Sequence, residues 1–325
     1  MRNFSFSKGA LSTALLIFGT AANAQSRYDN LLIDVEVNDS TVLTFVKTPD
    51  LFQSEWDTLA QPNFWRFVMQ VPPSVSILNV AATRQILEVM PLSQWDLKGD
   101  AEKELYKDSL CLNKGLDTTT RVFMTTGKSD FYAFDKVFPS ITRGVDKFIE
   151  YDTDPWYAQA ILMIESPGRI AYSNAGAYGP FQLMRSVARA HGLRVDSSVD
   201  ERKDFDKSAY GSSHLLRTAC IPEAKRILNQ FGIPVRGEDE FSLWFRLVVL
   251  HIYHAGAGNV NSVLTQVVKP SSGGKSLITS IWKSEYGNFG NSSQNYSQLA
   301  LAALIVLDDL IHSRCLEICD YNEEG

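Results

Sequence analysis

The feature that most limits the fold of this chain is a strongly apolar segment, Trp156–Ile164, framed by signals for the start and the end of a helix. Asp154 can cap a helix, and Pro155 suits its first position because proline lacks the N–H that stays unpaired there. Pro167 and Gly168 then stop the segment. A helix that is apolar on nearly all sides belongs in the interior of a helical domain. We therefore expect a helix over this segment, as part of a helical domain.

The helical pattern continues downstream. Residues Pro180–His191 place apolar side chains on one face, and Gly192 ends the pattern. Further helices are expected over Lys207–Cys220, Pro222–Phe231, Glu240–His254 and Ser293–Ser313, and a loop over Pro270–Lys275. The sequence thus predicts a helical domain from about Phe134 to Arg314.

The part of the chain before this domain has a mixed pattern. Alternation of apolar and polar residues over Leu31–Val46 predicts one or two strands, and Ala81–Val89 is interpreted as a helix. The Thr and Gly content of Leu116–Thr126 favours a boundary there. The expected fold is mainly α, with a smaller mixed α/β N-terminal region over residues 25–125 and a helical domain over residues 126–325.

The first 24 residues have the organisation of a secretory signal peptide. Two basic residues precede a short, mostly apolar run over Ala10–Thr20, and Ala22-Asn23-Ala24 has the small-x-small pattern of a cleavage site. The run is too short for a membrane anchor. Gln25 stands where a lipoprotein would need Cys. We expect cleavage after Ala24 and export to the periplasm without a lipid anchor.

Charge and apolar runs exclude several classes of partner. The chain has 31 Lys and Arg against 37 Asp and Glu, a net charge of −6. Cleavage would remove two basic residues and no acidic ones, leaving −8. This acidic balance argues against nucleic acid and against electrostatic capture of anionic lipid. No later segment reaches eighteen uninterrupted apolar residues, so no transmembrane anchor is expected.

The chain has four cysteines, Cys111, Cys220, Cys315 and Cys319, and no Cys-x-x-Cys pair. In an oxidising compartment two disulfides are the favoured interpretation, and buried free thiols are the alternative.

Glu165 closes the apolar segment. Desolvation disfavours the ionised form of a carboxyl group and raises its pKa. A carboxylic acid that stays protonated near neutral pH can give its proton to a glycosidic oxygen. Glu165 is therefore the candidate catalytic residue.

The residues after this glutamate resemble the catalytic signature of lytic transglycosylases, lysozyme-like enzymes that cleave bacterial peptidoglycan. The family pattern is Glu-Ser, then Ser-x-x-Gly-Ala-x-Gly, then Gln-x-Met. Its positions here are Glu165, Ser166, Ser173, Gly176, Ala177, Gly179, Gln182 and Met184. The resemblance implies a lysozyme-like fold for the helical domain.

Three further blocks follow in the family's order. Val199–Phe205 resembles a segment of the membrane-bound transglycosylase D group. Tyr253–Gly258 resembles the family's Tyr-Asn-Ala-Gly-x-Gly, and Gln294–Tyr296 is similar to the Thr-x-x-Tyr region of the transglycosylase D group. Two departures are visible. The stretch between the glutamate and the signature serine is one residue shorter than usual, and His254 replaces the family's Asn.

The resemblance implies cleavage between N-acetylmuramic acid and N-acetylglucosamine, with Glu165 as the only acid and base and a 1,6-anhydro sugar as product. Between Ser166 and Val195 there is no Asp or Glu, so this segment lacks the second carboxylate of a conventional glycosidase. Asp196 or Asp200 could still fold close. Hydrolysis of the same bond by a muramidase, and peptidoglycan binding without turnover, remain alternatives.

The expected contacts to the glycan strand come from a small set of side chains. They are Ser173, Gln182, Met184, Tyr253, His254 and Tyr296. Ser173 and Gln182 could instead cap the local backbone, and the two tyrosines could simply pack. His251 and His254 form a His-x-x-His pair, but a third ligand at metal spacing is absent. No metal and no cofactor are expected.

Overall fold

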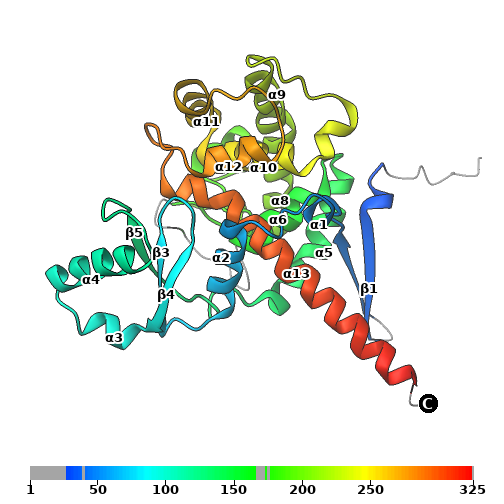
Figure 1. The fold of residues 1–325 in the computed structure, drawn as a ribbon. Helices are drawn as coiled ribbons and strands as arrows, with labels where there is room; N and C mark the ends of the chain where they lie inside the picture. Colours follow the sequence, from blue (N-terminus) through cyan, green and yellow to red (C-terminus); the bar gives the residue numbers. More distant parts are fainter. Residues whose placement is uncertain (1–26, 39–40, 166–172, 174–175, 324–325) are drawn as a thin grey trace, which may run out of the picture.

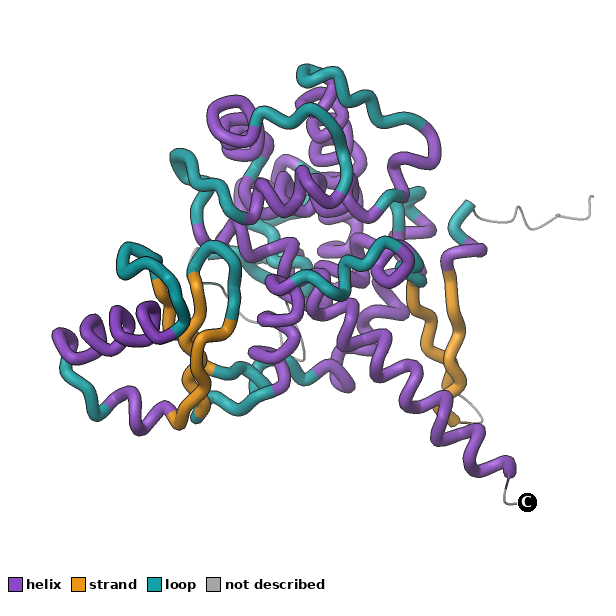
Figure 2. Tube along the Cα trace, viewed as in Figure 1, coloured by secondary structure: helices purple, strands orange, loops and turns teal. Residues whose placement is uncertain are grey.

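Helices dominate the protein (Figures 1 and 2). The computed structural model describes residues 27–38, 41–165, 173 and 176–323. The helices are α1 Asp50–Gln53, α2 Ala60–Gln70, α3 Leu92–Asp96, α4 Asp100–Asn113, α5 Phe134–Glu150, α6 Pro155–Glu165, α7 Arg185–Ala190, α8 Phe205–Leu215, α9 Ile221–Asn229, α10 Leu243–Ala255, α11 Ala257–Val263, α12 Lys275–Trp282 and α13 Asn291–Glu323. The strands are β1 Leu32–Asn38, β2 Thr41–Val46, β3 Val75–Val80, β4 Ile86–Pro91 and β5 Val122–Thr126. The expected mainly α fold with a smaller α/β region is confirmed.

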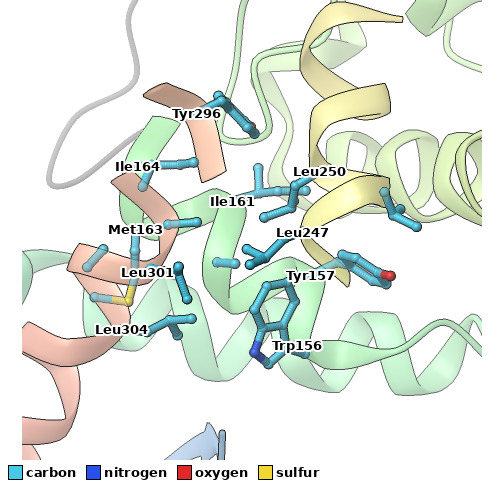
Figure 3. Packing of buried hydrophobic residues seen from close by; sticks show 14 of the residues in the cluster. Trp156, Tyr157, Ile161, Met163, Ile164, Leu247, Leu250, Tyr296, Leu301 and Leu304 are labelled. Atoms are coloured by element: carbon cyan, nitrogen blue, oxygen red, sulfur yellow. The ribbon is translucent and has the colours of Figure 1, made fainter. Parts of the chain in front are cut away.

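Helix α6 lies in the large core. Every residue from Pro155 to Ile164 is buried. The Asp154 carboxylate accepts a hydrogen bond from the Trp156 amide at 3.0 Å, which confirms the predicted cap. Side chains of α10 and α13 pack against α6 (Figure 3). This packing holds the C-terminal end of α6 at a fixed place in the domain.

The predicted strands over Leu31–Val46 are confirmed as the antiparallel hairpin β1–β2. The hairpin joins the large core, because the Gln159 side chain of α6 bonds both main-chain groups of Val46. Its Oε1 accepts from the amide at 2.8 Å, and its Nε2 donates to the carbonyl at 2.9 Å. A buried amide group that satisfies a strand edge in this way fixes the hairpin against α6.

The interpretation of Ala81–Val89 as a helix is wrong. The segment contains a turn followed by β4, which pairs with β3 in a three-stranded antiparallel sheet of order β4-β3-β5. This sheet and helices α3 and α4 enclose a second, small core and stand to one side of the helical body (Figure 1). Pairing with strands elsewhere in the chain overrides the local helical preference.

The helix expected over Pro180–His191 begins only at Arg185. Before it, Tyr178 and Leu183 form an isolated antiparallel bridge, and Gln182 has a positive φ of 48° that a helix does not allow. The other expected helices are found within a few residues, and α13 extends ten residues beyond Ser313.

Cys111 and Cys220 are buried free thiols, so the two-disulfide interpretation is wrong. The side chains of Cys315 and Cys319 lie outside the described residues, as does the predicted signal peptide. Of the helices that the structure describes, none combines the length and the apolar character needed to cross a membrane.

Candidate active site

Glu165 is the last residue of α6 and is partly exposed. Burial raises the pKa of its carboxyl group to about 7, and the Tyr296 hydroxyl lowers it in part. This confirms the expectation that desolvation is the main cause of a raised pKa. A group that is both reachable and protonated near neutral pH has the properties of a general acid.

Three tyrosines from different elements surround this carboxyl. They are Tyr132 before α5, Tyr253 in α10 and Tyr296 in α13. Burial raises the pKa of each phenol, and the charge of Glu165 raises it further. Tyr253 and Tyr296 were predicted from the sequence as glycan contacts. Tyr132 was missed, because it lies 33 residues before the glutamate in a segment without a family motif.

The Tyr253 hydroxyl is held firmly. It donates to the Phe181 carbonyl at 2.6 Å, and it lies 3.1 Å from the Ser212 hydroxyl. Phe181 is the residue before Gln182. This bond therefore joins α10 to the signature loop, residues 176–184. The packing alternative raised from the sequence describes Tyr253 well, since the contact is to protein backbone.

His254 stacks on Tyr296, with ring centroids 4.4 Å apart and an angle of 18° between the planes. Burial lowers the pKa of His254, so its imidazole is neutral at neutral pH. The histidine that replaces the family's Asn therefore supports the tyrosine nearest to Glu165.

Ser173 and Ala177 form a closed turn. The Ser173 hydroxyl accepts from the Ala177 amide at 2.9 Å, and the Ser173 amide donates to the Ala177 carbonyl at 2.9 Å. The Gln182 side chain likewise donates to the Gly179 carbonyl at 3.0 Å. Both polar side chains thus cap local backbone, whereas Met184 is 41% exposed at the start of α7.

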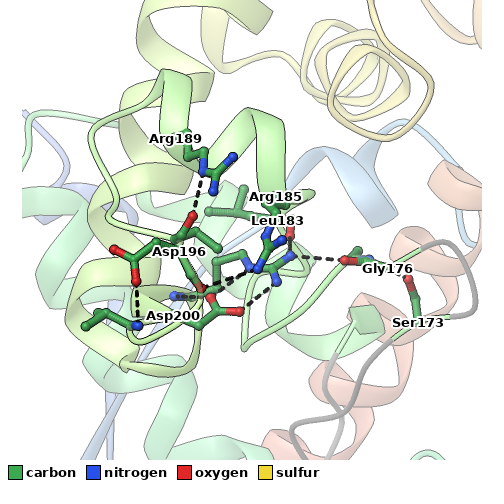
Figure 4. A network of polar contacts seen from close by, with 11 residues as sticks. Ser173, Gly176, Leu183, Arg185, Arg189, Asp196 and Asp200 are labelled. Atoms are coloured by element: carbon green, nitrogen blue, oxygen red, sulfur yellow. Dashed lines mark hydrogen bonds and ion pairs between the residues drawn. The ribbon is translucent and has the colours of Figure 1, made fainter.

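A buried arginine, Arg202, clamps the signature loop; its partners Gly176, Leu183 and Asp200 are labelled in Figure 4. Nη1 of Arg202 donates to the carbonyls of Gly176 and Leu183, both at 3.0 Å, and Nη2 pairs with Asp200 at 2.7 Å. Gly179 has φ of +89°, and a Cβ built there would overlap the main-chain oxygen of Arg202. The segment Val199–Phe205 was predicted as a family block, but its structural role as a clamp was missed.

The two carboxylates that could have faced Glu165 have other partners. Asp200 pairs with Arg202, and Asp196 accepts from Arg194 at 2.6 Å and from Ser198 at 2.7 Å. These hydrogen bonds lower the pKa of both groups. Within the described part of the chain, no carboxylate contributes to the pKa of Glu165.

The His-x-x-His pair is engaged in packing. Nε2 of His251 lies 2.8 Å from the Ser297 hydroxyl, and burial lowers the pKa of His251 to about 3. No three His, Cys, Asp or Glu side chains among the described residues are grouped so as to hold a metal ion. A cavity of about 680 Å³, lined by Asp154 and Tyr157, lies at the other end of α6, away from Glu165.

Residues 149–272 match the family model of the transglycosylase SLT domain. The matched region includes Glu165, the signature loop, the Arg202 clamp and the block Tyr253–Gly258, and it ends before Tyr296. The match supports the resemblance to lytic transglycosylases, and with it an action on peptidoglycan. No curated protein is similar enough to match the chain.

Proposed function

We propose that this protein is a periplasmic lytic transglycosylase of the peptidoglycan wall, similar to the membrane-bound transglycosylase D group. It cleaves the β-1,4 bond between N-acetylmuramic acid and N-acetylglucosamine and leaves 1,6-anhydro ends. One observation carries the proposal. Burial raises the pKa of Glu165 to about 7, and no carboxylate among the described residues acts on it. This arrangement supports a mechanism with a single acid and base.

In the proposed reaction, protonated Glu165 gives its proton to the glycosidic oxygen as the bond from that oxygen to C1 of the muramic residue breaks. The C6 hydroxyl oxygen of the same residue then bonds to C1. Its proton goes to the Glu165 carboxylate, which restores the acid. No water is consumed, so a second carboxylate to activate water is not needed.

The surrounding residues have supporting roles in this proposal. Tyr132, Tyr253 and Tyr296 exclude water from the carboxyl and keep it protonated. Ser173 and Gln182 cap the backbone of the signature segment, and the exposed Met184 contacts the glycan. His254 holds the Tyr296 ring by stacking.

The proposal is tested by digesting purified peptidoglycan sacculi with the protein and identifying the soluble fragments by mass spectrometry. We expect 1,6-anhydro ends from the wild type and no release from Glu165→Gln. Glu150→Gln is the matched control, because Glu150 also ends a helix but is exposed and pairs with Lys147 at 2.8 Å.

Reducing ends that carry one more water would assign the protein to the muramidases. Retention on sacculi without any release would assign it to peptidoglycan-binding domains. Either result contradicts the proposed function. Export is tested separately, by N-terminal sequencing of the periplasmic protein, which we expect to begin at Gln25.

A further inference from the structure

The first turns of α13 are buried although they are polar. Ser293, Gln294, Asn295, Ser297 and Gln298 are each less than 9% exposed. Hydrogen bonds between buried polar groups are strong in the low-dielectric interior and favour one arrangement of the groups that make them. These bonds therefore decide how α13 is rotated and shifted, and hence where its Tyr296 lies.

Arg84 makes the strongest of these bonds and comes from the N-terminal region. It lies in the turn between β3 and β4 and is 3% exposed. Its Nη2 donates to the Oδ1 atoms of Asn291 and Asn295, both at 2.7 Å. Its Nη1 donates to Asn79 at 3.2 Å, within the same sheet. One guanidinium thus joins the small sheet to the first turn of α13.

Aromatic rings enclose this cation in place of a carboxylate. The rings of Phe64, Trp65 and Phe123 have centroids 5.3 to 5.6 Å from its Cζ. None of the ion pairs found among the described residues involves Arg84. Burial lowers its pKa to about 10, so it stays charged at neutral pH. A buried cation that bonds only neutral amides is costly, and the three aromatic rings offset part of that cost.

A second bond from the same region holds the next turn. Nε1 of Trp65 in α2 donates to Oε1 of Gln298 at 3.1 Å. Tyr296 lies between Asn295 and Gln298 in the sequence. The N-terminal region therefore forms hydrogen bonds with α13 on both sides of the tyrosine that stacks on His254.

We propose that Arg84 is a positioning residue, through which residues 25–125 hold Tyr296 against Glu165. The inference rests on the proposed role of Glu165. It gives the N-terminal region a function within the site, beyond any binding of its own.

The test is direct titration of the Glu165 carboxyl by ¹³C NMR, assigned by its loss in Glu165→Gln. Among the described residues, Tyr132, Tyr253 and Tyr296 are the titratable groups whose pKa the charge of Glu165 affects. Arg84→Met should let the Tyr296 ring move and water enter. Because burial is the main cause of the raised pKa, it should fall by about one unit. Tyr296→Ala should lower it as well, because the loss of burial, the larger effect, outweighs the loss of the pKa-lowering Tyr296 hydroxyl. Arg84→Met should add nothing in that background.

Arg66→Met is the matched control. Like Trp65, Arg66 joins α2 to α13, by an ion pair with Asp309 at 2.6 Å. Asp309 lies 13 residues beyond Tyr296, about 20 Å further along the helix. Arg66→Met should leave the pKa of Glu165 unchanged. If Arg84→Met does not fold, Arg84→Lys keeps the charge and loses the forked pair of bonds, and it should give a smaller shift in the same direction.

An unchanged pKa in a folded Arg84 variant, an equal shift in Arg66→Met, or additive shifts with Tyr296→Ala would each overturn the proposal. A merely structural role would lower the melting temperature without moving the pKa. The titration requires no turnover. Failure of the wild type to cleave sacculi would refute the proposed function. The titration would still show whether Arg84 affects the pKa of Glu165.

Discussion

The pH dependence of cleavage follows directly from the surroundings of Glu165. An ordinary Glu with a pKa of 4.5 is protonated in about one molecule in 300 at pH 7. With a pKa of about 7, half of the molecules carry the proton at that pH. The acid must be protonated in the resting enzyme, so kcat/KM should fall as pH rises through 7. The rate at pH 8 should be roughly a tenth of that at pH 6.

Salt should hardly change the pH at which kcat/KM falls. Burial is the main cause of the raised pKa, and ions screen a desolvation effect only weakly. The assay is a kcat/KM profile on soluble glycan fragments at low and high ionic strength. A fall in kcat/KM centred near pH 4.5, or one that salt shifts strongly, would show that the carboxyl is solvated or coupled to another charge. The buried-acid reasoning would then be refuted.

Three further predictions concern stability. Gly179→Ala should destabilise the fold by at least about 2 kcal/mol, because its Cβ would overlap the Arg202 carbonyl oxygen. Gly176 has a φ of +88°, and no described atom lies within 4 Å of the Cβ that alanine would add. Gly176→Ala should therefore lower the free energy of unfolding by only about 1 kcal/mol. Urea unfolding of the two variants measures both values. The raised pKa of Glu165 means that its folded form loses stability as pH rises from 4.5 through 7. Glu165→Gln should therefore melt higher than the wild type at pH 8 and at the same temperature at pH 4, and equal differences would contradict this. Tyr253→Phe leaves a carbonyl without its donor and should cost about 1 to 3 kcal/mol in urea unfolding; no change would mean that water replaces the hydroxyl.

Local signals allowed a good part of the fold to be predicted. The α6 helix was placed correctly because its cap, Asp154, and its apolar residues lie next to one another in sequence. The same proximity predicted the raised pKa of Glu165 and its cause, burial. The hairpin β1–β2 followed from alternation over neighbouring residues.

Contacts between distant segments account for the errors. Ala81–Val89 forms a strand instead of a helix because β3 and β5 complete its sheet, and β5 lies more than 30 residues away. Helix α7 starts late because Arg202 holds the preceding bridge. Likewise, Arg84 and Tyr132 reach the site across long stretches of sequence, and no local pattern marks them.

The fate of water during cleavage tests the central claim most directly. Sacculi are digested in water enriched in heavy oxygen, and the released fragments are weighed by mass spectrometry. If Glu165 works alone and the C6 hydroxyl attacks C1, no heavy oxygen enters the new muramic ends, and Glu165→Gln releases nothing. One heavy oxygen in each new end would show that water is the attacking group and would contradict the account.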